Sequence, residues 1–150
     1  MTGLNTNSVD AAIASAQTAL GLNASQPART WSVARMRPGA RGFLLVVFGP
    51  PERASAIAAV DPDSGEVLEA AHLPAREQHA LITADEAILR AGLGPDTEAR
   101  LVWDPSPASR SRFYPLWQLQ SADRRVWVDS VRGEVWHTLD TPRGGGSRGV

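Results

Sequence analysis

The sequence predicts an α+β fold in which two short helices each pack on one face of an antiparallel sheet. Two segments have the apolar spacing of an amphipathic helix, and strand-like segments follow each of them. The motif V-D-x-x-x-G-E-V also occurs twice, at residues 60–67 and 128–135. A motif that recurs together with the order of elements indicates an internal repeat.

The first predicted helix begins near Ser8, whose hydroxyl can cap a helix N-terminus. Its apolar residues follow the spacing of one buried helical face: Val9, Ala12, Ile13, Ala16 and Leu20. Gly21 or Asn23 can end this helix, because both residue types tolerate the left-handed conformation at a helix C-terminus. We expect residues 1–7, before the helix, to be flexible.

The second predicted helix repeats this spacing with Ala84, Ala87, Ile88 and Ala91. Thr83 is the expected N-cap, and Glu86, three residues later, completes a capping box. Gly92 follows the last apolar position, so it is expected to end the helix.

Four strand-like segments follow each helix. After the first helix they are residues 30–36, 42–48, 55–60 and 66–70. After the second helix they are residues 100–103, 113–120, 124–129 and 134–139. The run at residues 43–48 is apolar on both faces, which predicts a central strand covered above and below. The Gly-, Arg- and Ser-rich tail, residues 141–150, is predicted to be disordered.

The repeated motif predicts two structural turns. In each copy an Asp opens the turn and a Gly lies near its end, which pairs Asp61 with Gly65 and Asp129 with Gly133. A tight hairpin needs a residue at positive φ, and Gly adopts that conformation freely.

With these turns, the chain resembles the PepSY family. The resemblance rests on the D-x-A-I start of each helix, on the aromatic strand at residues 113–119 and on the two V-D-x-x-x-G-E-V turns. It covers residues 8–73 and 82–140 as a tandem pair, although the first copy has residues 43–48 in place of a tyrosine strand. The resemblance implies a helix packed on an antiparallel sheet. It also implies binding or inhibition, often toward peptidases, without shared catalytic residues.

Composition and charge limit the classes of partner. The 150 residues include no cysteine, which excludes disulfides and thiolate metal sites. All fifteen basic residues are Arg, and the net charge is −1, whereas nucleic-acid binding usually needs a strong basic surplus. No window approaches the ~20 apolar residues of a membrane span, and no secretory signal is visible. We therefore expect a cytoplasmic protein without nucleic-acid partner or membrane span, or an exported one whose leader was trimmed.

Several segments match the consensus of a catalytic or metal-binding motif but lack the flanking secondary structure or the ligand positions that the chemistry needs. Residues 145–149 spell G-x-S-x-G and residues 144–149 spell G-x-G-x-x-G, but no helix can follow either motif. Asp61 and Asp63 begin like a calcium loop, yet the Gly and the twelfth position do not match one. Turn formation explains both Asp residues and Gly65 without a metal.

The remaining polar candidates are three histidines and a pair of repeat-equivalent carboxylates. His72, His79 and His137 lack the spacing of metal ligands on one element. Glu66 and Glu134 each follow a turn Gly, which is typical of a solvated strand start. We therefore predict no catalytic residue, no metal and no cofactor.

A group of aromatic and cationic residues is the candidate binding surface: Tyr114, Trp117, Trp127, Trp136, Arg124 and Arg125. Strand alternation sends Trp127 to the face opposite Val126 and Val128. If the valines are core, Trp127 belongs to an outer recognition face, where Trp and Arg are common interface anchors. In the alternative, the tryptophans complete a core against the alanine-rich helices.

These observations predict a non-catalytic module that binds a protein or peptide, including inhibition or regulation of a peptidase or envelope enzyme. The alternative is a structural protein whose edge strands pair with copies of the same chain. The sequence leaves the oligomeric state open.

Overall fold

The computed structural model describes residues 6–23, 27–50, 53–73 and 79–139. In this part of the chain it has two helices and eight strands, and every strand pairing except one is antiparallel, which confirms the α+β class. The chain divides into two compact units. Unit 1 is Met1–Val33 with Arg41–Ala80, and unit 2 is Ala34–Ala40 with Leu81–Val150.

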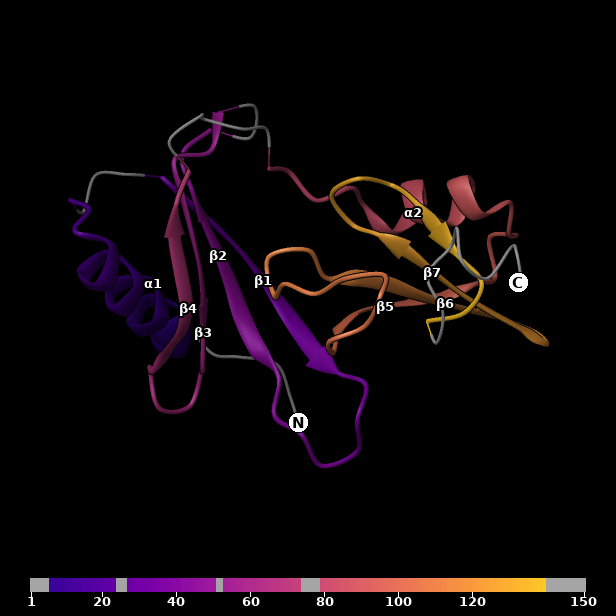
Figure 1. Ribbon diagram of the computed structural model, residues 1–150, viewed down its shortest axis with the longest axis horizontal. Coiled ribbons are helices and arrows are strands. Elements are labelled where there is room, and N and C mark those ends of the chain that lie inside the picture. Colours follow the sequence, from indigo (N-terminus) through magenta and orange to yellow (C-terminus); the bar gives the residue numbers. More distant parts are fainter. Residues whose placement is uncertain (1–5, 24–26, 51–52, 74–78, 140–150) are drawn as a thin grey trace. The chain divides into compact units, whose positions relative to one another are not determined.

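Unit 1 is a helix followed by an antiparallel meander. The helix is α1 (Thr6–Leu20), and the strands are β1 (Ala28–Arg35), β2 (Phe43–Phe48), β3 (Ala56–Val60) and β4 (Val67–His72). Each strand pairs with its neighbour in sequence, in the order β4-β3-β2-β1. The helix α1 lies along this sheet and packs on β2, β3 and β4 (Figure 1).

The core of unit 1 lies between α1 and the two inner strands. Small and branched side chains alternate on the covered face, which lets the helix approach closely: Ala12, Ala16 and Leu20 meet Leu44, Val46, Phe48, Ala56, Ala58 and Val60. Every residue of β2 and β3 is buried, so both faces of these two strands are covered. The predicted central strand at residues 43–48 is therefore confirmed.

Unit 2 has the same order of elements. The helix is α2 (Ala84–Ala91), and the strands are β5 (Glu98–Trp103), β6 (Leu116–Ser121), β7 (Arg124–Asp129) and β8 (Val135–Trp136). These strands also pair in sequence order, and α2 packs on β5, β6 and β7 (Figure 1). The last two residues of β1 belong to unit 2, where they pair in parallel with β5.

The ends of the helices agree with the sequence predictions except at the N-cap of α1 and in the capping box of α2, where the side chain of Glu86 bonds to Arg90 instead of the N–H of Thr83. The hydroxyl of Thr83 accepts a hydrogen bond from the backbone of Glu86 at 3.1 Å, and Gly92 ends α2 at φ +72°. Gly21 ends α1 at φ +68°, with its N–H bonded to a carbonyl of the last turn. The predicted N-cap at Ser8 is wrong, because α1 already includes Thr6.

Two strands are shorter than predicted. The segment predicted at residues 113–120 becomes a strand only at Leu116, because the N–H of Tyr114 closes a turn onto Ser111 and Pro115 has no N–H to donate. The last strand covers Val135 and Trp136 rather than residues 134–139. The tail predicted to be disordered lies outside the described residues, as do residues 1–5.

The two copies of the repeated motif form the same turn. In each copy the N–H of the Gly donates to the carbonyl of the Asp at 2.8 Å, and the Gly has φ +79°. One carboxylate oxygen of Asp61 accepts two backbone N–H bonds inside the turn, and Oδ1 of Asp129 does the same. In the described residues no helix is long and apolar enough to cross a membrane.

Candidate functional site

The sheet of unit 2 has one face against α2 and one face without a helix. Val126 and Val128 are buried against α2 in one cluster with Ala87. Alternation along β7 therefore places the half-buried Trp127 on the helix-free face, beside its cross-strand partner Gln118. The valines are therefore core, as in the first of the two alternatives, but Trp127 packs against a second apolar cluster that includes Leu116 and Trp136.

The six candidate binding residues do not form one surface. Trp117 lies on the helix side, and its Nε1–H donates to the carbonyl of Ile82 at 2.9 Å. Trp136 is only 7% exposed and belongs to a buried cluster next to Trp127. Tyr114 lies before β6, under the guanidinium of Arg132.

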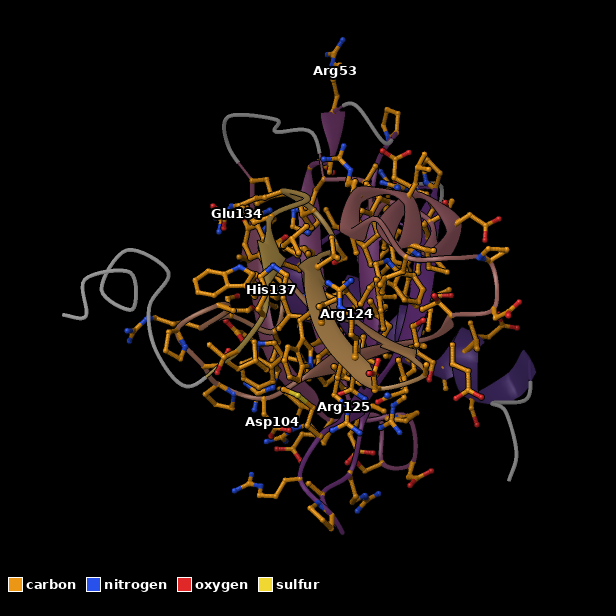
Figure 2. All side chains as sticks on the ribbon, turned by 90° about the vertical axis from the view of Figure 1, so that its right-hand side faces the viewer. Arg53, Asp104, Arg124, Arg125, Glu134 and His137 are labelled. Atoms are coloured by element: carbon orange, nitrogen blue, oxygen red, sulfur yellow. The ribbon has the colours of Figure 1, made fainter. Side chains whose placement is uncertain are left out.

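Of the predicted surface, the helix-free face keeps Trp127 and Arg125. Arg124 and Arg125 are both exposed at the start of β7, where Figure 2 labels them. Alternation sends their side chains to opposite faces, with Arg125 on the side of Trp127. The expectation of one continuous aromatic and cationic patch is therefore corrected, since α2 covers the other face of this sheet.

Two glutamines, which the sequence reading missed, fix the side chains of this face. The Oε1 atom of Gln118 accepts a hydrogen bond from Trp127 Nε1 at 3.2 Å. The Oε1 atom of Gln120 accepts one from Arg125 Nε at 2.8 Å. The signal was present in β6, where Gln118 and Gln120 alternate with Trp117 and Leu119.

We call this surface the β5–β7 face. It includes a shallow hollow of about 270 Å³, lined by Glu98, Ala99, Arg100, Gln118, Gln120 and Arg125. Its charge is positive, because the exposed guanidiniums of Arg100 and Arg125 outnumber the one carboxylate, that of Glu98. The face thus combines a fixed tryptophan, two amides and two guanidiniums.

A second arrangement of arginine and aromatic residues follows β5. The buried ring of Trp103 lies between two guanidiniums, those of Arg35 at 5.5 Å and Arg112 at 5.1 Å from its centroid. Its Nε1–H donates to the hydroxyl of Ser109 at 3.2 Å. These contacts hold the connection between β5 and β6 against the end of β5.

Asp104 anchors residues 35–37 to the same end of β5. Its Oδ1 accepts from Arg35 Nε at 2.7 Å, and its Oδ2 accepts from the backbone N–H groups of Met36 at 2.6 Å and Arg37 at 3.0 Å. Burial alone would raise the pKa of Asp104, but the hydrogen bonds and the charge of Arg35 outweigh it and lower this pKa below its ordinary value. Both carboxylate oxygens of Asp104 therefore accept hydrogen bonds that hold residues 35–37 in place.

The other polar candidates are not brought together. His137 is exposed and lies apart from Asp104 in Figure 2, whereas His79 is buried in unit 1 and His72 is exposed on β4. Glu66 and Glu134 are exposed in different units. The two glycine-rich motifs at residues 144–149 lie outside the described residues.

The predicted turn at Asp61 contains an ion pair in the place where a calcium loop would hold its ion. Nη2 of Arg41 lies 2.8 Å from Asp63 Oδ2 and 3.4 Å from Asp61 Oδ1. A single guanidinium thus pairs with both carboxylates that suggested the loop. Across the described ranges no group of three His, Asp or Glu residues is placed to hold a metal ion.

The comparisons with known proteins leave the resemblance to the PepSY family a prediction. The sequence matches no family model, and neither the curated proteins nor the solved structures include a match.

Proposed function

We propose that this chain is a non-catalytic binding module that recognises an acidic, extended segment of a partner protein on the β5–β7 face. The observation that carries the proposal is Trp127, which is half-buried against Leu116 and Trp136 and is fixed by Gln118 on the face that α2 does not cover. Tryptophan and arginine in such a position supply a large share of the energy of many interfaces.

The chemistry of the face favours an acidic and extended partner. Arg100 and Arg125 supply guanidiniums that pair with carboxylates in bidentate geometry. Gln118 and Gln120 offer both donors and acceptors, which suits the backbone groups of an extended chain. A shallow hollow receives short side chains rather than a buried small molecule.

The order of elements supports a PepSY-like role. Each unit has a helix followed by four strands, and each contains the same Asp–Gly turn. The resemblance would make the partner a peptidase or an envelope enzyme that the module inhibits or regulates. This role rests on the resemblance alone.

The test is a selection of peptides from a random library on the immobilised protein, followed by affinity measurements on the selected peptides. We expect acidic sequences, and we expect the double variant Trp127→Ala/Arg125→Ala to bind them at least about tenfold more weakly. Arg53→Ala is the matched control, because Arg53 is an exposed arginine of unit 1, whereas the residues of the β5–β7 face belong to unit 2.

Two outcomes would contradict the proposal. One is a selection that enriches no acidic sequence. The other is a set of peptides that bind the folded double variant as tightly as the wild type. Circular dichroism and thermal unfolding establish that each variant is folded before its affinity is compared.

A second candidate function is self-assembly through β4. Among the described strands β4 pairs with β3 alone, so one of its edges is open. Leu68 on this strand is 38% exposed, and Glu69 is its single formal charge among Val67–His72. An edge strand with little charge pairs readily with another strand. Light scattering separates assembly from a monomeric binding module.

A further inference from the structure

Unit 2 contains a pocket of about 230 Å³ between the β5–β6 connection and the β7–β8 turn. The polar residues that line it are Ser109, Arg110, Ser111, Tyr114 and Arg132. It lies at the opposite end of the strands from the hollow of the β5–β7 face, which is formed where β5 and β7 begin.

Two guanidiniums of this pocket form no ion pair within the part of the chain that the structure describes. Arg110 and Arg132 are exposed, and neither forms an ion pair with a carboxylate of the described residues. By contrast, Arg35, Arg41 and Arg90 each pair with a carboxylate. The pocket therefore concentrates positive charge that the fold does not neutralise.

Arg132 is held in place by its surroundings. Its guanidinium stacks on the ring of Tyr114, 4.3 Å from the centroid. Its backbone N–H donates to Oδ1 of Asp129 at 2.8 Å, inside the turn that Gly133 closes. Stacking uses the flat face of a guanidinium and leaves its N–H edge to bind an anion, so the side chain is arranged before a ligand arrives.

The two serines have different roles. The hydroxyl of Ser109 accepts from Trp103 and donates to the carbonyl of Tyr114 at 2.6 Å, so it holds the wall of the pocket. The Oγ atom of Ser111 accepts from the N–H of Phe113 at 3.1 Å, which leaves its proton for a further acceptor. The pocket thus presents two guanidiniums and one hydroxyl donor.

We infer that this pocket binds a phosphate group. Two guanidinium forks and a hydroxyl provide more donors than the two oxygens of a carboxylate can accept, whereas the three terminal oxygens of a phosphomonoester can use them all. The two positive charges match the charge of nearly −2 that a phosphate carries at neutral pH. The inference does not rest on the binding of an acidic segment, because it uses other residues.

The experiment is calorimetric titration of the whole chain with inorganic phosphate, with O-phospho-L-serine and with acetate, at equal ionic strength. We expect saturable binding of the phosphates and none of acetate. Arg110→Ala and Arg132→Ala should each weaken phosphate binding about tenfold, as expected when a charge-assisted hydrogen bond is lost. Arg124→Ala, an exposed arginine of unit 2 at the start of β7 that lines neither this pocket nor the hollow of the β5–β7 face, is the matched control and should leave the affinity unchanged.

The two phosphate ligands separate the possible sources of the group. Equal affinity for both indicates a site for the phosphate alone, and tighter binding of phosphoserine indicates a phosphate carried on a larger molecule. Arg132→Lys keeps the charge without the fork and the stack, so it should bind more weakly than the wild type. The inference is overturned if phosphate does not bind, if acetate binds equally well, or if the folded Arg110→Ala and Arg132→Ala proteins keep the wild-type affinity.

Discussion

Asp104 is the residue whose environment most affects how stability depends on pH. Its carboxylate is 15% exposed and accepts hydrogen bonds from Arg35, Met36 and Arg37. Burial acts to raise its pKa, but these bonds and the charge of Arg35 lower the pKa below the unfolded value of about 3.9. Its contribution to stability is therefore complete above the unfolded pKa and is lost as the pH falls through the folded pKa.

Asp104→Asn should lower the free energy of unfolding at pH 7 by about 1–3 kcal/mol, because hydrogen bonds to a charged acceptor become bonds to a neutral amide. The difference from the wild type should shrink at pH 3, below the pKa of this carboxyl in the unfolded chain, because the unfolded state then binds a proton more readily than the native state. Urea unfolding at the two pH values measures this. Asp123→Asn, in the exposed β6–β7 turn, is the control. A difference that stays constant between pH 7 and pH 3 would contradict the assignment.

At the scale of elements, each Asp–Gly turn faces the helix of its own unit. A Cβ atom built on Gly65 would lie 3.3 Å from the hydroxyl of Ser15 in α1. One built on Gly133 would overlap the guanidinium of Arg90 in α2. Since both glycines have φ +79°, a side chain is disfavoured in either turn, but only the second turn also loses a packed arginine.

Gly65→Ala should lower the free energy of unfolding by about 1–2 kcal/mol through the left-handed conformation alone. Gly133→Ala should cost about 0.5 kcal/mol more, because the exposed end of Arg90 must shift away from the glycine and from its 3.0 Å bond to Glu86. Chemical denaturation of a double-mutant cycle with Arg90→Ala isolates this second cost. In the Arg90→Ala background the two glycine substitutions should cost about the same, and an excess at Gly133 that persists there would refute this account.

At the scale of the whole molecule, the two candidate functions predict different oligomeric states: a monomer for the binding module and an oligomer for self-assembly. The two units share an order of helix and four strands, so each has its own helix-covered core. The β5–β7 face would bind a partner through its side chains, whereas β4 would bind through its open backbone edge. The binding module therefore requires no second copy of the chain, whereas self-assembly requires the open edge of β4 to pair with another copy.

We expect size-exclusion chromatography with light scattering to give a mass near 16.0 kDa at all concentrations tested. A mass that rises with concentration would favour assembly instead. Leu68→Arg distinguishes specific pairing from general association, because a charge on the edge strand opposes strand pairing. Recovery of the monomer by this substitution would support self-assembly through β4, the second candidate function, in place of a monomeric binding module.

The sequence alone determined the local structure. The spacing of apolar residues predicted both helices, and the run at residues 43–48 predicted a strand buried on both faces. Gly65 and Gly133 marked the two turns, and Thr83 marked the start of α2. Each of these depends on residues close in sequence, through helical or strand periodicity, capping and the backbone freedom of glycine.

The tertiary structure alone decided how the aromatic and cationic residues are divided. The alternation of side chains along β7 places Trp127 on the face opposite Val126 and Val128. Only the packing of α2 against the valines determines which of these two faces a helix covers. The stack of Arg132 on Tyr114 joins two different connections, and Asp104 meets residues 35–37 across a separation of 67 to 69 residues. No local pattern encodes such contacts, because they depend on which elements the buried cores bring side by side.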